Sequence, residues 1–206
     1  MITSCGGIIL SGGQNTRMNG RNKAFVEIGG QRFVERIAGA LSEVLTECLL
    51  VTREPAQYTG LNLRVVEDIF QARSPLTGIH SGLVHLRSAF GVCVSCDMPL
   101  LRSGVIRLLE EAIERHYDIV VPATGTFYQP LCAVYSKSCI PFIEDQLNEN
   151  DLKVDRLFRK VRVKKIPYEL IETVDPGLDS FFNVNTPEDI GTAVALLQKE
   201  SEGFPG

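Results

Sequence analysis

The chain alternates between short apolar runs and stretches in which apolar residues recur every three or four positions. The short runs are typical of buried strands and cover residues 8–10, 47–52, 63–66, 91–95 and 118–122. The helical spacing predicts helices over residues 31–44, 74–86, 103–115 and 137–147. Strands that alternate with helices indicate an α/β fold with a single doubly wound, mostly parallel sheet flanked by helices. We find no linker or internal repeat and expect one domain over residues 1–206.

The later part of the chain predicts the edges of this fold. Residues 127–135 have the composition of a strand, and Pro130 within them indicates an edge or a bulge. Residues 181–185 predict a last short strand, and Pro187 with two acidic residues after it predicts the start of a final helix. The basic stretch 155–165 is expected to be a solvated face, with a specific anion site as the alternative.

The stretch from Gly6 to Lys23, GGIILSGGQNTRMNGRNK, combines a predicted strand with a glycine pair and two cations. Gly12 and Gly13 let the backbone turn sharply and approach a ligand without a side chain in the way. Backbone N–H groups in such a turn, together with Arg17 and Lys23, can bind phosphate. The spacing matches neither the P-loop nor the dinucleotide fingerprint. We interpret the stretch as a nucleotide-phosphate loop; the alternative is a glycine-rich turn with two solvated cations.

Two carboxylates, Asp68 and Asp97, come close after predicted strands. The carboxyl ends of parallel strands meet at one edge, where open α/β sheets bind their ligands, so we expect both near the loop. Asp97 beside a nucleoside triphosphate would be a natural Mg²⁺ ligand; a turn-forming aspartate is the alternative. The sequence offers no Ser-His-Asp or Cys-His arrangement. Phosphoryl or nucleotidyl transfer needs none if the nucleophile is a phosphate, which is already anionic.

The composition narrows the class of protein. The net charge of −4 and the pI of about 5.5 give no strong attraction to nucleic acid or anionic lipid, so neither is an expected partner. No apolar run approaches the roughly 20 residues of a membrane span, and MITSCGG lacks the apolar stretch of a secretion signal, so we expect a cytoplasmic protein. Cys93 and Cys96 have CxxC spacing, but residues three apart in a strand point to opposite faces. We therefore expect core positions in preference to a redox or metal pair.

Five motifs follow one another along most of the chain: LSGGQNTRMNGRNKAF, VVEDIF with SPLTGIHSGL, SCDMPLL, FYQPLCAVY and FNVNTPEDI. Together they resemble the molybdenum cofactor guanylyltransferases, a family of Rossmann-like nucleotidyltransferases. The resemblance covers about Gly6 to Leu197. It implies transfer of GMP from GTP to the phosphate of molybdopterin or molybdenum-molybdopterin, with release of pyrophosphate and with Mg²⁺ as cofactor. It also implies contact with molybdenum-cofactor insertion proteins.

The resemblance also implies roles for single residues. The implied GTP-binding positions are Leu10, Ser11, Gly12, Gly13, Lys23, Asp68 and Asp97. The implied catalytic residues are Arg17, Lys23 and Asp97, with Asp97 as the Mg²⁺ ligand. The residues implied on the acceptor (pterin) side are Gln129, Asn183 and Asn185. We accordingly expect residues 1–100 to form a nucleotide-binding half, residues 101–200 an acceptor-binding half and residues 201–206 a frayed tail.

The chain departs from the family pattern at five positions. Ser11 replaces alanine, Asn19 glycine and Asn22 aspartate, and Ser74 and Thr77 replace small residues of a turn. Weakened activity is one alternative that these changes leave open. Others are a nucleotidyltransferase that uses CTP or a sugar-phosphate acceptor, and a non-catalytic nucleotide-binding relative. The glycine pair of the loop favours guanine within the family.

Overall fold

The structure, a computed structural model, describes residues 5–12 and 22–202 of the 206, with side chains up to residue 199. The strands are β1 (Cys5–Leu10), β2 (Glu27–Ile28), β3 (Gln31–Arg32), β4 (Cys48–Thr52), β5 (Arg64–Glu67), β6 (Phe90–Ser95), β7 (Ile119–Thr124), β8 (Phe127–Tyr128), β9 (Cys132–Ser136) and β10 (Val163–Pro167). The α-helices are α1 (Phe33–Ser42), α2 (Pro75–His85), α3 (Ser103–Glu111), α4 (Ile140–Asn148), α5 (Val154–Leu157), α6 (Tyr168–Ile171) and α7 (Pro187–Glu202). Short 3₁₀ helices are η2 (Lys23–Phe25), η3 (Pro55–Tyr58), η4 (Lys137–Cys139) and η5 (Asp179–Phe181).

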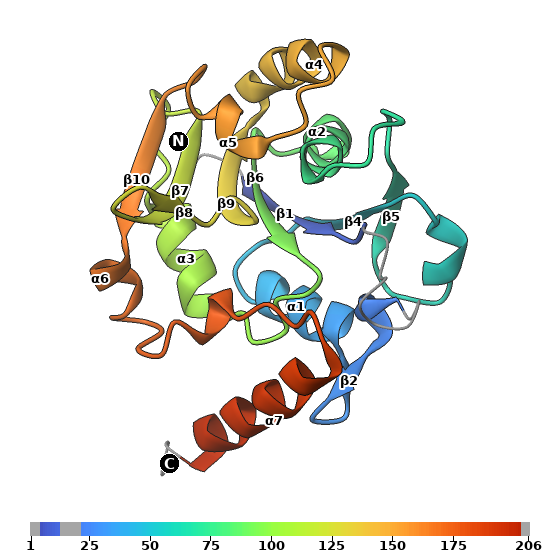
Figure 1. The fold of residues 1–206 in the computed structure, drawn as a ribbon, viewed down its shortest axis with the longest axis vertical. Helices are drawn as coiled ribbons and strands as arrows, with labels where there is room; N and C mark the ends of the chain where they lie inside the picture. The colour runs from blue at the N-terminus through green and yellow to red at the C-terminus, as the bar shows by residue number, and fades with distance from the viewer. Residues whose placement is uncertain (1–4, 13–21, 203–206) are drawn as a thin grey trace.

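Within the described residues, one sheet has the strand order β10-β7-β9-β6-β1-β4-β5, and β8 pairs with β7 (Figure 1). Pairing is parallel between β1 and both its neighbours, between β4 and β5, and between β7 and β10. Strand β9 runs antiparallel to β6 and β7. The predicted mostly parallel α/β sheet is therefore confirmed.

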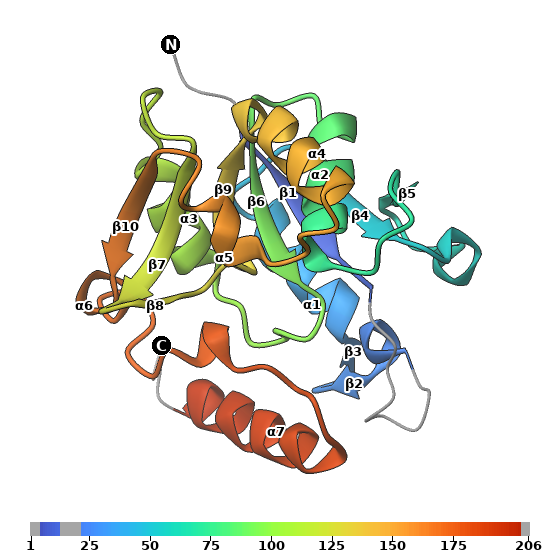
Figure 2. The same ribbon diagram turned by 45° about the horizontal axis from the view of Figure 1, so that its top comes forward.

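Apolar residues cover both faces of the sheet, which explains the continuous apolar runs in its strands. On β1, Ile9 packs in the cluster under α1 and α3, whereas Ile8 and Leu10 pack in the cluster under α2 and α4. Figure 2 shows these two helix pairs on opposite sides of the sheet. Cys93 and Cys96 fall into the two opposite clusters, and both are free thiols. The core interpretation of the CxxC pair is therefore confirmed.

The strand order reverses beside β1. The chain runs from β1 outward through β4 to β5 and then returns to place β6 on the other flank of β1. The backbone N–H of Cys96 donates to the carbonyl of Leu10 over 3.0 Å, so the carboxyl ends of β1 and β6 lie together. A ligand of an open α/β sheet binds at such a switch point.

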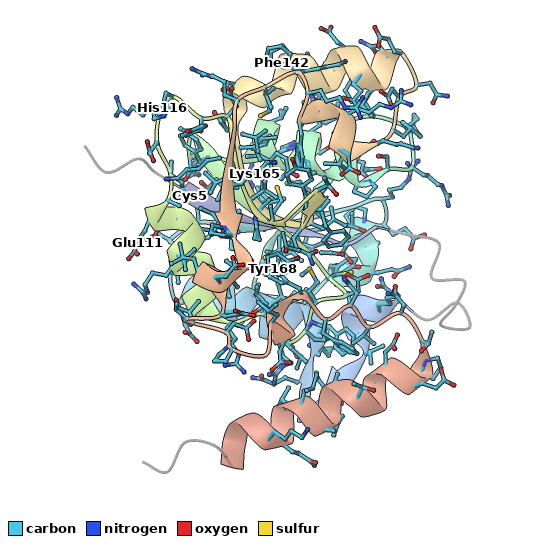
Figure 3. The ribbon with its side chains drawn as sticks, turned by 60° about the vertical axis from the view of Figure 1, so that its left-hand side comes forward. Cys5, Glu111, His116, Phe142, Lys165 and Tyr168 are labelled. Carbon is cyan, nitrogen blue, oxygen red and sulfur yellow. The ribbon has the colours of Figure 1, made fainter. Side chains whose placement is uncertain are left out.

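Near the far edge of the sheet, one prediction needs correction and another is incomplete. Residues 127–135 form two strands, β8 and β9, separated at Gln129–Leu131, because Pro130 cannot donate to a ladder. The basic side chains of the stretch 155–165 are mostly exposed, as expected for a solvated face, but the stretch ends inside edge strand β10, which the pattern did not predict. Lys164 on β10 bonds to the Ala112 carbonyl over 3.0 Å. Lys165, labelled in Figure 3, lies over the ring of Tyr128.

Two predictions for the C-terminal part of the chain also need correction: the last strand and the start of the tail. Residues 181–185 are not a strand, because backbone N–H groups of this segment bond outside the sheet: that of Val184 donates to the Asp97 carbonyl over 2.8 Å. The final helix begins at Pro187, as predicted, and continues to Glu202. The expected tail at residues 201–206 therefore starts inside this helix, and residues 203–206 lie outside the described part.

None of the helices in the described residues combines the length and apolar character needed to cross a membrane.

Candidate functional site

A cleft of about 1140 Å³ opens at the carboxyl ends of β1, β4, β5 and β6. Five of the residues that the sequence suggests for GTP binding line it: Leu10, Ser11, Gly12, Asp68 and Asp97. The edge predicted from strand order is thus the edge that holds the cavity. Gly13, Arg17 and Asn19 lie outside the described residues.

Lys23 does not itself line the cleft, but it links Asp97, which does, to Asn185 near the C-terminal end of the described chain. Its ammonium group donates to Asn185 Oδ1 over 2.8 Å and lies 3.5 Å from Asp97 Oδ2. The side chains of Lys23 and Asp97 are only 14% and 20% exposed, so solvent screens the pair weakly. Three residues that the sequence suggested for different tasks therefore form one cluster.

A helix start holds Asn185 in this cluster. Asp189 Oδ2 accepts from the backbone N–H groups of Asn185 and Thr186, each over 2.8 Å, and Thr186 Oγ1 accepts from the N–H of Asp189. This reciprocal pattern is a capping box at the start of α7. The two backbone hydrogen bonds lower the pKa of Asp189, which keeps its carboxylate charged. The sequence carried this signal in its Thr-Pro-Glu-Asp spacing.

One oxygen of Asp97 is left for a ligand. Asp97 Oδ1 is buried and has no hydrogen-bond partner among the described residues, while Oδ2 meets Lys23. No group of three or more His, Cys, Asp or Glu side chains able to hold a metal occurs in residues 5–12 and 22–202. Mg²⁺ commonly uses one or two carboxylates and takes its other ligands from phosphate and water. A single orphaned carboxylate oxygen fits that mode of binding.

Asp68 supplies a second orphaned oxygen in the same cleft. Its Oδ1 is buried without a partner among the described residues. Burial raises the pKa of Asp68, and the positive charge of Arg53 offsets part of that rise. A carboxylate in this state gains most from a ligand that brings N–H donors or positive charge.

The departures Ser74 and Thr77 have structural partners at the start of α2. Ser74 Oγ accepts from the N–H of Leu76 and donates to the carbonyl of Leu152. Thr77 Oγ1 donates to the carbonyl of Ala72 over 3.0 Å. Both hydroxyls therefore stabilise the turn in place of the smaller residues of the family pattern.

The residues suggested for the acceptor side do not all lie together. Gln129 and Asn183 line a second cavity of about 330 Å³, beside Met98, Tyr128 and Asp155. Asn185 instead joins Lys23 in the cluster described above. Leu131 lines both cavities and Met98 follows Asp97 directly, so the two cavities adjoin near Asp97.

The structure adds residues to the site that the sequence did not suggest, and one of them contacts the loop without lining the cleft. Tyr58, buried at the end of η3, bonds through its hydroxyl to Ser11 and Asn22 of the loop. A single tyrosine after a proline-containing turn carries no sequence signal for such a contact.

Known proteins are similar to this chain over most of its length. A family model described as the MobA-like NTP transferase domain matches residues 7–165. The molybdenum cofactor guanylyltransferase of Desulfosudis oleivorans is 36% identical over 192 residues, covering 93% of this chain and 95% of that protein.

Solved structures agree with the fold. Molybdopterin-guanine dinucleotide biosynthesis protein A from Archaeoglobus fulgidus superposes with a TM-score of 0.83 at 25% identity, covering 94% of this chain and 98% of that one. A 4-diphosphocytidyl-2C-methyl-D-erythritol synthase from Anaerococcus prevotii gives a TM-score of 0.70 at 18% identity, covering 95% and 96%, and supports the fold alone. The Rossmann-like nucleotidyltransferase fold and the family resemblance are both confirmed.

Proposed function

The chain belongs to the family of MobA-like NTP transferase domains, and on that basis we propose that it transfers GMP from GTP to the phosphate of molybdopterin. The observation that carries this proposal is the cluster of Lys23, Asp97 and Asn185, of which Asp97 lines the cleft, on the fold that molybdopterin-guanine dinucleotide biosynthesis protein A from Archaeoglobus fulgidus shares. A triphosphate needs positive charge beside it, which Lys23 supplies directly and which an available carboxylate oxygen supplies when it holds a metal ion.

The reaction we propose is an in-line displacement. A phosphate oxygen of molybdopterin attacks the α-phosphorus of GTP, a new phosphoanhydride bond forms, and the bond to the β-phosphate breaks to release pyrophosphate. No general base is needed, because the attacking phosphate is already anionic. Lys23 donates to the phosphates and offsets their charge as it shifts toward the leaving pyrophosphate. We propose the same task for Arg17.

We propose that Asp97 holds Mg²⁺ through Oδ1, the orphaned oxygen. When bound, the ion supplies positive charge for the triphosphate and the departing pyrophosphate. Asp68 is proposed to bind the guanine nucleotide on the other side of the cleft, where its own orphaned oxygen lies.

For the acceptor we propose the second cavity, with Gln129 and Asn183 as polar contacts, and Asn185 as the residue that keeps Lys23 between the two substrates. This assignment is supported by the position of the cavity beside the Asp97 segment. Residues from both the first and last thirds of the chain would then contact the reacting phosphates.

We further propose a cytoplasmic location and transfer of the product to molybdenum-cofactor insertion proteins. Six free thiols support a reducing compartment. Cell fractionation with detection of the chain tests the location, and recovery mainly outside the cytosolic fraction would contradict it.

The experiment that tests the function is a thermal-shift titration with Mg²⁺ and each of GTP, CTP, ATP and UTP. A ligand that binds only the native state stabilises it by about 2.7 kcal/mol at a hundredfold excess over Kd. We expect the largest shift with GTP, followed by pyrophosphate release when molybdopterin is added. A larger shift with CTP would favour a cytidylyltransferase, and GTP binding without pyrophosphate release would favour a non-catalytic relative.

A further inference from the structure

The hydroxyl of Tyr58 lies where two parts of the loop meet. Tyr58 is 2% exposed, and its ring packs against Phe25 with the ring centroids 5.0 Å apart. Its oxygen is 2.5 Å from Ser11 Oγ and 2.8 Å from Asn22 Nδ2. Ser11 and Asn22 both line the cleft, and they lie on either side of residues 13–21.

Asn22 links Tyr58 to the short helix that begins at Lys23. Its Oδ1 accepts from the N–H of Ala24 over 3.1 Å, which caps the 3₁₀ helix that begins at Lys23. Its Nδ2 donates both to Tyr58 and to Gln57 Oε1, the latter over 2.9 Å. With Oδ1 and Nδ2 both occupied, the amide has one orientation, and the residue before Lys23 is fixed.

The chemistry of the phenol suits this contact. Burial raises the pKa of Tyr58, and hydrogen bonds with Ser11, Asn22 and Thr52 offset only part of the rise, so the group stays protonated at neutral pH. Because Asn22 donates to the phenol oxygen, the phenol proton is available to a hydroxyl oxygen such as Ser11 Oγ. Ser11 and Asn22 are also two of the positions where the loop departs from the family pattern, and both contact this one hydroxyl.

We propose that Tyr58 is a positioning residue for GTP binding, whose hydroxyl joins Ser11 to Asn22 and thereby sets the place of Lys23. The inference rests on the proposed function, because it takes the triphosphate as the group that Lys23 receives. Packing alone does not require the hydroxyl, since a phenylalanine ring would fill the same space. A buried hydroxyl is favourable only when it is hydrogen-bonded, and here its partners belong to the cleft.

The test is the Kd of GTP with Mg²⁺, measured by calorimetry well below the unfolding temperature. We expect Tyr58→Phe to keep the fold and to weaken GTP binding about tenfold, the order of effect of losing two neutral hydrogen bonds. Thr59→Ala is the matched control. It removes a side-chain hydrogen bond from the next residue, between Thr59 Oγ1 and the Ala56 carbonyl, on the exposed side of the same segment. We expect it to leave the Kd unchanged.

A double-mutant cycle separates positioning from a general loss of structure. If Tyr58 acts through Lys23, then Tyr58→Phe will change the Kd less than about twofold in a Lys23→Ala background. An equal loss in both backgrounds would overturn the role assigned to Lys23.

The possible outcomes separate failure of the Tyr58 inference from failure of the proposed function. Failure of the unaltered chain to bind GTP would overturn both. GTP binding that is normal in the unaltered chain and in Tyr58→Phe would overturn the positioning role alone. Should Tyr58→Phe fail to fold, Asn22→Ala breaks the same contact outside the core, and an unchanged Kd in that variant would equally overturn the inference.

Discussion

Asp118 lies at the edge formed by the amino ends of the parallel strands, and Asp97 lies at the opposite edge, formed by their carboxyl ends. The hydrogen bonds of these two carboxylates differ in kind. Asp118 precedes β7 and accepts from Ser138 Oγ over 2.7 Å and from the backbone N–H and guanidinium of Arg162. Asp97 follows β6, shares one oxygen with Lys23 and has the other buried without a partner among the described residues. A carboxylate that is fully bonded serves the fold, whereas one with an idle oxygen is available to a ligand.

Burial has different net effects on the pKa values at these two edges. Burial by itself raises the pKa of Asp118, but the hydrogen bonds from Arg162 and Ser138 outweigh it and lower the pKa to about 2. At the ligand edge, burial dominates and the pKa of Asp68 is raised. The cleft therefore holds carboxylate oxygens at a cost in stability that a cationic or N–H-bearing ligand can offset.

The largest expected effect is at Asp97. We expect Asp97→Ala to fold with little change in Tm and to lose at least about a thousandfold in kcat, because charge stabilisation at the phosphates is lost. Pyrophosphate release from GTP with molybdopterin and Mg²⁺ measures it. Asp97→Asn, which keeps the shape of the side chain and removes its charge, should show a similar loss of kcat. Turnover near that of the unaltered chain would disprove the metal assignment.

A smaller loss is expected at Lys23. Removal of a charge-assisted hydrogen bond to phosphate should weaken GTP binding about tenfold to a hundredfold in Lys23→Ala. Calorimetric titration with GTP measures the Kd. Lys160→Ala, which removes an exposed lysine far along the chain from the loop, is the control and should bind GTP normally. Equal affinities in the two variants would count against the role of Lys23.

At the opposite edge, Asp118→Ala should affect stability and leave transfer unchanged. We expect the free energy of unfolding at pH 7 to fall by about 2 kcal/mol, since the charged hydrogen bonds are lost while the partner Arg162 stays 63% exposed to water. Urea denaturation measures the change. A lowered kcat at full stability would break the distinction between the two edges.

The pH dependence of that loss follows from the pKa. The folded-state pKa of Asp118, about 2, lies below its ordinary value of 3.8, so the contribution is complete above pH 3.8 and disappears as the pH falls through 2. The difference in unfolding free energy between the unaltered chain and Asp118→Ala should therefore shrink between pH 4 and pH 2, by about 2 kcal/mol. A constant difference across that window would be inconsistent with the ion pair.

The smallest expected effect is at Asp68, where we expect the substitution to increase stability. Because the pKa of Asp68 is raised by burial, its ionisation opposes folding above its folded-state pKa. Asp68→Asn should therefore raise the Tm slightly at pH 7 and lose that gain below pH 3.8, the ordinary value of the group. Thermal scans at the two pH values measure this change. A Tm at pH 7 that is lower than that of the unaltered chain would show that Asp68 stabilises the fold.

Much of the edge that holds the cleft was predictable from local sequence patterns. Apolar runs located β1, β4, β5 and β6, and the rule that parallel strands end at one edge brought Asp68 and Asp97 to the cleft. Strand β10 was obscured because Lys164 and Lys165 interrupt its apolar pattern. Each has a partner on another element: a helix-end carbonyl for Lys164 and an aromatic ring for Lys165.

Local patterns in the sequence were enough to predict the main strands and helices as far as β7, the fold class and the family, because apolar periodicity and motif spacing are properties of neighbouring residues. The contacts that form the site became visible only in the folded structure. Asn185 reaches Lys23 across 162 positions and Tyr58 reaches Ser11 across 47, and no local pattern encodes either contact. The physical reason is that a hydrogen-bond partner distant in sequence is chosen by how the packed elements close the loops between them. An orphaned oxygen such as Asp97 Oδ1 is apparent only after every nearby donor has been placed.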